Sequence, residues 1–210
     1  MQTMFSSCSG LTSLDVSGLD TSKVTNMSYM FSNCSGLTHL NVSGNYVKRS
    51  ELDDIIRRIN VLRSDVDSLL QNNGGENGGE VLYYNPTMSI ENDRAVNGFD
   101  TSKVTNMESM FSGCSGLTSL DLSGFNTSNV TNMSNMFKNC SSLTNLDSMQ
   151  NISVSLDLSA TILDVTSLLD VIDNLTTVTT TQTLTLGSTL LAKLSEDQIA
   201  IATNKGWTVV

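Results

Sequence analysis

The sequence is poor in the residue types that most often carry chemistry. Of its 210 residues one is histidine, one is proline and one is tryptophan, and aromatic residues make up only 5%. A single histidine, His39, excludes zinc sites built on several imidazole ligands. The scarcity of aromatic rings also argues against one large core and favours small units with little interior volume.

Basic residues are scarce as well. The chain has 11 lysines and arginines against 21 acidic residues, which gives a formal net charge of −10. Proteins that bind nucleic acid need clustered cations to neutralise phosphates. The lysines outside residues 45–98 are scattered along the chain. We therefore predict no nucleic-acid partner.

Long apolar runs are absent too. No stretch approaches about 18 consecutive apolar residues, so the sequence predicts no membrane insertion. The first residues lack the charged and apolar regions of a signal peptide. We therefore expect either a chain that acts without secretion or a fragment of a longer protein.

The chain does contain one sequence motif, called the phrase below, that is repeated four times. A Met-Phe pair opens each copy, and the pairs are Met4-Phe5, Met30-Phe31, Met110-Phe111 and Met136-Phe137. The first two pairs are 26 residues apart, as are the last two, whereas the middle spacing of 80 is one period plus 54. The array is therefore interrupted once and resumes from Gly44 at Phe99. A fixed period of this size predicts a solenoid of stacked coils.

Within each copy the spacing Leu-x-x-Leu-x-Leu predicts a short strand. In the second copy it reads Leu37-Thr38-His39-Leu40-Asn41-Val42. The alternation places apolar side chains on one face and polar side chains on the other. The stretch Met-Phe-x-x-Cys predicts a tight turn with Met, Phe and Cys pointing inward, and residues 24–27 predict a second extended piece.

All four cysteines fall three residues after the phenylalanine of a copy. They are Cys8, Cys34, Cys114 and Cys140. In stacked coils, equivalent residues lie about 4.8 Å apart, a separation at which a disulfide is just within reach. A column of small buried thiols is the simpler interpretation. A one-dimensional column does not supply converging ligands for zinc, so we predict no metal and no cofactor.

The outward positions of the predicted strands form the candidate binding surface. They carry Ser13, Asp15, His39, Asn41, Ser119, Asp121, Asn145, Asp147 and Asp157. Aspartates stacked about 5 Å apart would match the carboxylate separation of retaining glycosidases. Such enzymes also need a pocket that raises one pKa and aromatic side chains that hold the sugar, and this surface offers neither. The sequence therefore predicts a non-enzymatic polar strip that attracts Ca²⁺ at most weakly.

The full phrase resembles a known repeat. Over about 4–44 and 99–147 it reads Met-Phe-x-x-Cys-x-x-Leu-x-x-Leu-Asp-Leu-Ser-x-Phe-Asp/Asn-Thr-Ser-x-Val-Thr-x-Met, and it is similar to the BspA-like leucine-rich repeat of surface proteins. The resemblance implies a non-enzymatic extracellular protein that binds host matrix proteins or neighbouring cells. Similar repeats also occur in bacteriophage structural proteins. The family's binding residues form no fixed motif, so the resemblance assigns no site residue.

Residues 45–98 differ in kind. Ser50 followed by acidic residues predicts the start of a helix over 51–70. A heptad seam follows at Leu52, Ile55, Ile59, Leu62, Val66 and Leu69. This stripe must be buried on the repeats or on other chains. We predict a homo-oligomer, with a trimer favoured, or docking to another virion protein. A glycine-rich linker at 72–79 and a short strand at 81–84 complete the insertion.

After residue 148 the sequence no longer follows the repeat motif. Residues 155–159 predict one more repeat strand, and Leu168, Leu169, Ile172 and Leu175 have helical spacing. A further strand is predicted at 183–187. Ser195 is a good N-cap for a short helix that ends before Gly206. We interpret this last helix, together with Trp207, as the cap that shields the end of the stack.

Together these patterns predict an α/β repeat protein, a leucine-rich-repeat solenoid with a coiled-coil-like helical insertion and a helical C-terminal cap. The repeats occupy 1–44 and 99–159, the insertion 45–98, and the last repeats and cap 160–210. The predicted function is a non-enzymatic recognition or structural component at a virion surface, such as a phage tail fibre or receptor-binding protein, that attaches to a host protein or glycan. The alternatives are a fragment of a bacterial cell-surface adhesin and, less favoured, a polysaccharide-degrading spike.

Overall fold

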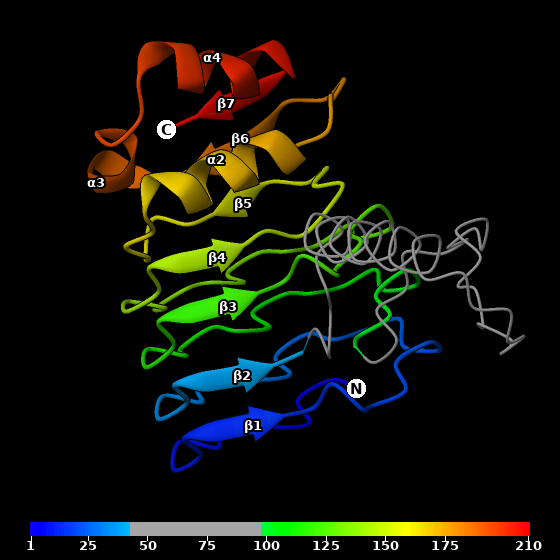
Figure 1. Cartoon of the computed structure of the whole chain (residues 1–210). Helices are drawn as coiled ribbons and strands as arrows, with labels where there is room; N and C mark the ends of the chain where they lie inside the picture. The colour runs from blue at the N-terminus through cyan, green and yellow to red at the C-terminus, as the bar shows by residue number, and fades with distance from the viewer. Residues whose placement is uncertain (43–97) are drawn as a thin grey trace, which may run out of the picture. The chain divides into compact units, whose positions relative to one another are not determined.

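The computed structural model describes residues 1–42 and 98–210. They belong to one compact unit of the chain. The predicted heptad helix, linker and strand 81–84 lie outside the described residues. Within this unit the repeats are stacked in chain order (Figure 1).

Four short parallel strands lie at the Leu-x-Leu positions of the copies. They are β1 (Ser13–Asp15), β2 (His39–Asn41), β3 (Ser119–Asp121) and β4 (Asn145–Asp147). β1 pairs with β2, and β3 pairs with β4, both in parallel. The register places Leu14 opposite Leu40 and Leu120 opposite Leu146. One repeat period therefore advances the chain by one strand.

A second ladder runs through the Thr-Asn-Met segments (25–27, 105–107 and 131–133) and crosses the interruption. Asn26 forms a parallel bridge with Asn106, which forms another with Asn132. The N–H of Met27 donates to the carbonyl of Asn106 at 2.9 Å, and Met107 donates to Asn132 at the same distance. The same bond thus joins neighbouring copies whether or not the interruption separates them. The repeats before residue 43 and after residue 97 form one stack.

The backbone bends recur at two phases of the repeat. The residue two positions before the phenylalanine of each Met-Phe pair has a left-handed backbone conformation, with φ between 53° and 56°. These residues are Thr3, Tyr29, Ser109 and Asn135. Residues two positions after the phenylalanine are also left-handed: Ser7, Asn33, Gly113 and Asn139. Non-glycine residues seldom adopt this conformation. Its recurrence shows that the Met-Phe turn has the same shape in every copy.

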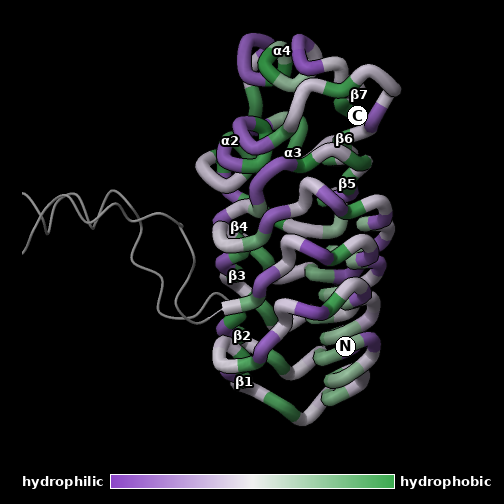
Figure 2. Tube along the Cα trace, turned by 90° about the vertical axis from the view of Figure 1, so that its right-hand side faces the viewer, coloured by the Kyte–Doolittle hydropathy of each residue, from purple (hydrophilic) through white to green (hydrophobic). Residues whose placement is uncertain are grey.

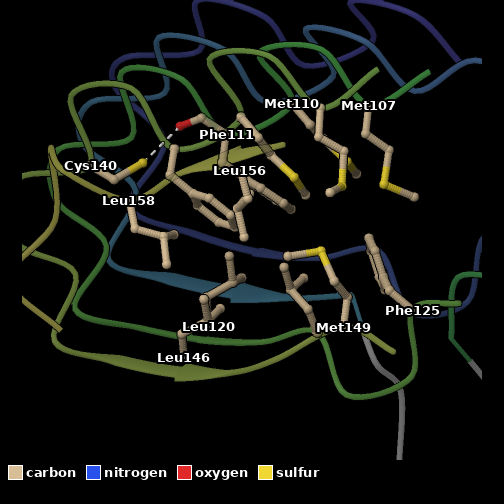
Figure 3. Close-up of a cluster of buried hydrophobic side chains, with 14 of the residues drawn as sticks. Met107, Met110, Phe111, Leu120, Phe125, Cys140, Leu146, Met149, Leu156 and Leu158 are labelled. Carbon is tan, nitrogen blue, oxygen red and sulfur yellow. Dashed lines mark hydrogen bonds between the residues drawn. The ribbon is translucent and has the colours of Figure 1, made fainter. Parts of the chain in front are cut away.

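A column of stacked phenylalanine rings runs through the interior. The ring centroid of Phe31 lies 5.6 Å from that of Phe5 and 5.7 Å from that of Phe111, which lies 5.9 Å from Phe137. Strand leucines face this column, and methionines fill the space beside it (Figure 3). The Met, Phe and Cys side chains of the Met-Phe turns are buried in all copies except the first, where Met4 is 53% exposed.

The construction of the stack changes after β4. Among the described strands, β5 (Leu156–Asp157) pairs with β6 (Gln182–Thr185), which pairs with β7 (Trp207–Val209), all in parallel. The place beside β4 is taken by α2 (Val165–Asn174), whose Ser167 hydroxyl accepts a hydrogen bond from the N–H of Leu146 at 2.9 Å. Figure 2 shows that α2 continues the side of β1–β4, whereas β5 lies on the opposite side.

This arrangement corrects the expectation that residues 155–159 extend the row of β1–β4. A strand does form there, but on the other side of the stack. The reason is that the coil containing β5 has no Met-Phe turn. Its chain runs straight where the copies below bend, and Leu156 and Leu158 face the Phe111 and Cys140 level of the core (Figure 3).

Polar side chains fix the helix ends in the C-terminal part. Asp164 caps α2 by accepting from the N–H of Ser167, and a capping box of Ser195 and Gln198 starts α4 (Glu196–Asn204). The short helix α3 (Gly187–Leu191) has no side-chain cap and was not predicted. Trp207 is 3% exposed, and its ring N–H donates to the carbonyl of Thr176 at 2.8 Å. None of the helices in the described part of the chain is long and apolar enough to cross a bilayer.

Candidate functional site

All the predicted surface residues except Asp157 lie on one face of β1–β4. They form two outward rows: Ser13, His39, Ser119 and Asn145 in one, and Asp15, Asn41, Asp121 and Asp147 in the other. The side chains of the first row are all exposed. We call these two rows the strand face. Asp157 is separate from it, because β5 belongs to the sheet with β6 and β7.

Two aspartates of the second row, Asp15 and Asp121, shape the turns that follow their strands. Asp15 Oδ1 accepts hydrogen bonds from the N–H of Ser17 at 3.0 Å and from its hydroxyl at 2.7 Å. The same pair of bonds joins Asp121 to Ser123 and Asp157 to Ser159. The sequence Leu-Asp-Leu-Ser, or Leu-Asp-Val-Ser in the first copy, is therefore a turn motif in which the carboxylate accepts a hydrogen bond from a backbone N–H.

The aspartates of the strand face differ in their surroundings. The hydroxyl and N–H of Ser17 hold the pKa of Asp15 below its ordinary value, whereas a general acid needs a raised pKa. The register places Asp15 opposite Asn41 and Asp121 opposite Asp147. Within residues 1–42 and 98–210, no three His, Cys, Asp or Glu side chains gather where they could hold a metal ion.

His39 stands at the edge of the strand face as an exposed side chain. Its Nδ1 lies 2.9 Å from the hydroxyl of Thr38, which itself donates to the carbonyl of Thr12 at 3.0 Å. In the later copies Thr144 donates to the carbonyl of Thr118 at 2.9 Å. These threonines tie neighbouring copies together beside the first row, so the row is held by a fixed backbone.

The cysteines form a column of free thiols, three of them buried. Each buried thiol donates to the phenylalanine carbonyl of the copy before it: Cys34 to Phe5, Cys114 to Phe31 and Cys140 to Phe111, the last drawn in Figure 3. Burial raises the pKa of all three thiols, that of Cys140 to about 12. Cys8 is exposed and departs from the predicted inward position.

We expect one fast-reacting thiol in the folded protein. Iodoacetamide at about pH 8 should alkylate Cys8 and leave Cys114 and Cys140 unmodified, because burial excludes the reagent and the raised pKa leaves almost no thiolate. Mass spectrometry of the digested protein identifies the labelled sites. A Cys8→Ser variant is the control and should take up almost no label until it is unfolded. Fast labelling of Cys140 in the native protein would contradict the buried column.

The same burial makes stability depend on alkaline pH. The pKa of Cys140 rises from 9.0 to about 12 on folding, so the thiol ionises first in the unfolded chain. Its contribution to stability is complete below about pH 9 and is lost progressively as the pH rises towards 12. We expect the urea midpoint to fall between about pH 8 and pH 10 less steeply in Cys140→Ala than in the parent protein. Equal slopes would show that the thiol is not buried.

A polar cluster on another side of the stack was missed by the sequence analysis. The hydroxyl of Tyr29 donates to Glu108 Oε1 at 2.5 Å, and the amide of Asn132 donates to Glu108 Oε2 at 3.3 Å. The hydrogen bond to Glu108 raises the pKa of Tyr29. The cluster could have been predicted from departures from the repeat motif. Tyr29 stands where other copies have Thr, Ser or Asn, and Glu108 stands where others have Gln or Ser.

A hollow of about 520 Å³ opens next to this cluster, where the fourth copy gives way to β5. One side is formed by residues 131–135 and the other by residues 154–157 with Gln182, Thr183 and Thr185 of β6. We call it the step hollow. Ligand pockets commonly measure about 300–1,000 Å³. Sequence patterns gave no sign of it, because it results from the change in construction between two coils.

Comparison with known proteins identifies one family. A family model described as "Mycoplasma protein of unknown function, DUF285" matches residues 1–68 and 83–175. The match therefore contains all four Met-Phe copies and the whole strand face. No curated protein and no solved structure matches the chain.

Proposed function

The chain belongs to this family, and we propose that it is a non-enzymatic recognition protein that attaches to a protein or glycan through the strand face. We propose further that its stacked repeats are a leucine-rich-repeat solenoid of the BspA-like type, with a helical insertion within 45–98 and a helical cap after residue 160. The observation that carries the proposal is the pair of outward polar rows, which repeat their chemistry at each strand.

The composition of the strand face supports attachment by many weak contacts. Its hydroxyl, amide, imidazole and carboxylate groups can donate and accept hydrogen bonds, which suits neutral glycans and polar protein surfaces. The rows contain no aromatic anchor, so each contact is expected to be weak. Because the ladder holds the rows rigidly, little entropy is lost on binding, and contacts repeated along one ligand add to one another.

The hydrogen bonds of the aspartates support a non-enzymatic role. Asp15 and Asp121 each use one carboxylate oxygen to hold a turn, and the lowered pKa of Asp15 disfavours proton donation. A polysaccharide-degrading spike would need these carboxylates for catalysis. Release of reducing ends from a host glycan, lost in Asp121→Asn, would establish that activity in place of the present proposal.

We place the protein at a surface that meets host cells. The first setting is the virion, as a phage tail-fibre or receptor-binding component, and it follows from the resemblance to repeats of phage structural proteins. The alternative is a bacterial cell-surface adhesin, which the description of the family as a Mycoplasma protein favours. Immunogold labelling separates the two: label on purified particles supports the virion, and label on the cell envelope supports the adhesin.

Self-association through the heptad seam remains a prediction, because the seam lies outside the described residues. Light scattering of the purified chain should give the mass of an oligomer, with a trimer favoured over a dimer. A monomer at every concentration would leave docking to another virion protein as the role of residues 51–70.

Binding to host cells tests the attachment surface. In a Ser119→Lys/Asn145→Lys variant, bulky charged side chains replace two exposed residues of the first row, and we expect binding of the labelled protein to cells to fall about tenfold. A Ser188→Lys/Asn204→Lys variant adds the same charge at exposed positions of α3 and α4 and should bind like the parent. Equal loss in both variants would mean that charge alone is responsible and would refute the proposed surface.

A further inference from the structure

Four backbone N–H groups at alternate residues around the Met-Phe turn join the second copy to the third, and four equivalent groups join the third to the fourth. The first two donors and acceptors of each series are Met27 to Asn106 and Tyr29 to Glu108 at one level, and Met107 to Asn132 and Ser109 to Ser134 at the next, all at 2.9 Å. At both levels the acceptors are peptide carbonyls of residues i and i+2 in a neighbouring segment. The copies are therefore joined here by a fixed main-chain pattern.

The fourth copy ends this pattern at the step hollow. The equivalent N–H groups belong to Met133, Asn135, Phe137 and Asn139, and none of them has an acceptor within the described part of the chain. Of these four residues, Met133 and Asn135 line the hollow. Asn135 keeps the left-handed conformation of Tyr29 and Ser109. The fourth copy thus presents the same two donors in the same local backbone, with the hollow beside them.

We propose that the step hollow binds an extended peptide segment of a partner protein, whose carbonyls at i and i+2 accept hydrogen bonds from the N–H groups of Met133 and Asn135. In the second and third copies, the equivalent N–H groups donate to carbonyls with this same spacing. The peptide would take the position that a further Thr-Asn-Met segment would occupy, which is recognition by addition of a strand to an open edge.

The rest of the lining fits a peptide of neutral or basic character. Val154 is partly exposed and supplies an apolar contact for one side chain, and Gln182 and Thr183 supply polar groups beside it. The carboxylate of Asp157 and the net charge of −10 disfavour an acidic segment.

A peptide fits the step hollow better than a glycan does. The lining contains no aromatic side chain on which a sugar ring could stack. This site is separate from the strand face and takes a different ligand, so it goes beyond the proposed function. Either surface can fail its test while the other stands.

The test uses the full chain and a peptide copied from its own repeats. The probe is the acetylated and amidated segment 130–138, which places the carbonyls of Asn132 and Ser134 at the required spacing and includes the basic Lys138. We expect it to bind, to slow hydrogen exchange at the amides of Met133 and Asn135, and to bind more tightly than a scrambled peptide. A panel of neutral oligosaccharides is titrated in parallel.

Two matched variants locate the binding. Thr183 on β6 and Thr208 on β7 are opposite each other in register, but only Thr183 lines the hollow. Thr183→Trp should fill the hollow and weaken peptide binding at least about tenfold, whereas Thr208→Trp should change it less than about twofold. Circular dichroism shows whether each variant is folded, and the exchange measurement on the parent protein stands if one is not. The proposal is overturned if the amides of Met133 and Asn135 keep their exchange rates, if both variants bind alike, or if oligosaccharides bind in place of the peptide.

Discussion

Replacing Phe111 with alanine is expected to lower the free energy of unfolding by about 3–5 kcal/mol. The ring is fully buried and stacks on Phe31 on one side and on Phe137 on the other. Its removal costs the transfer energy of the side chain and leaves a cavity between copies that cannot close without moving the ladder. Because domains of this size are stable by only about 5–15 kcal/mol, the variant should be near its unfolding midpoint in mild urea.

Phe5 provides the matched control for this prediction. It lies at the end of the described column, is only partly buried and stacks on Phe31 alone. Phe5→Ala should therefore cost clearly less than Phe111→Ala in the same urea titration. Equal losses at the two positions would contradict a continuous column, because they would mean that Phe111 has no more neighbours than Phe5.

Replacing Gly36 with alanine is expected to cost about 1–3 kcal/mol. A Cβ at this position would lie 2.3 Å from the carbonyl oxygen of Ser9 and 3.3 Å from that of Leu11, both in the first copy. Main-chain atoms cannot rotate away as a side chain can, so the two copies would have to separate. The expected result is a lower urea midpoint with an unchanged slope.

Gly10 occupies the same phase in the first copy and is the control. A Cβ there would meet nothing within 4 Å, so Gly10→Ala should change stability by less than about 0.5 kcal/mol. A large loss at Gly10, or none at Gly36, would contradict close stacking of the first two copies.

The strands of the four copies could be predicted because the Met-Phe pair fixes the position of every other residue within its repeat. A leucine stands nine residues after the phenylalanine of each Met-Phe pair, and each of the strands β1–β4 is centred on that leucine: Leu14, Leu40, Leu120 and Leu146. The same regularity predicted a column of buried cysteines, and three of the four are buried. Met4 and Cys8 are exposed because they belong to the first copy, although their sequence context is the same as that of their buried equivalents.

The strand β5 shows that the local sequence alone does not determine on which side of the stack a strand lies. Residues 119–123 and 155–159 have the identical sequence Ser-Leu-Asp-Leu-Ser, yet the first contributes β3 to the strand face and the second contributes β5 to the opposite side. The difference is set by the rest of the coil: a Met-Phe turn precedes β3, and none precedes β5. Asp157 therefore lies apart from the strand face, although its immediate neighbours match those of Asp121.

The step hollow follows from the same change and could not be read from a single phrase. It depends on which N–H groups lose their acceptors when a bent coil is followed by a straight one. The polar cluster of Tyr29, Glu108 and Asn132 was more accessible to prediction, since two of its members replace the usual residues of the phrase. In a repeat protein, departures from the common phrase are as informative about surface sites as the phrase is about the core.

A disulfide across the interruption tests most directly whether the two halves of the array form one stack. Thr25 and Thr105 are both exposed, and the N–H of Thr105 donates to the carbonyl of Thr25 at 2.8 Å. Neighbouring strands are about 4.8 Å apart, which suits a disulfide between two introduced cysteines. In a Cys8→Ser background, the Thr25→Cys/Thr105→Cys variant should oxidise readily and lose that bond on reduction.

The matched control pairs Thr25→Cys with Thr131→Cys, one level further along the same ladder, where the separation is about twice as large and no disulfide should form. Peptide mapping by mass spectrometry identifies the linked residues. Formation of the first disulfide without the second is the predicted result. Failure of the first pair to link in folded protein would show that the repeats on the two sides of the interruption do not share a ladder.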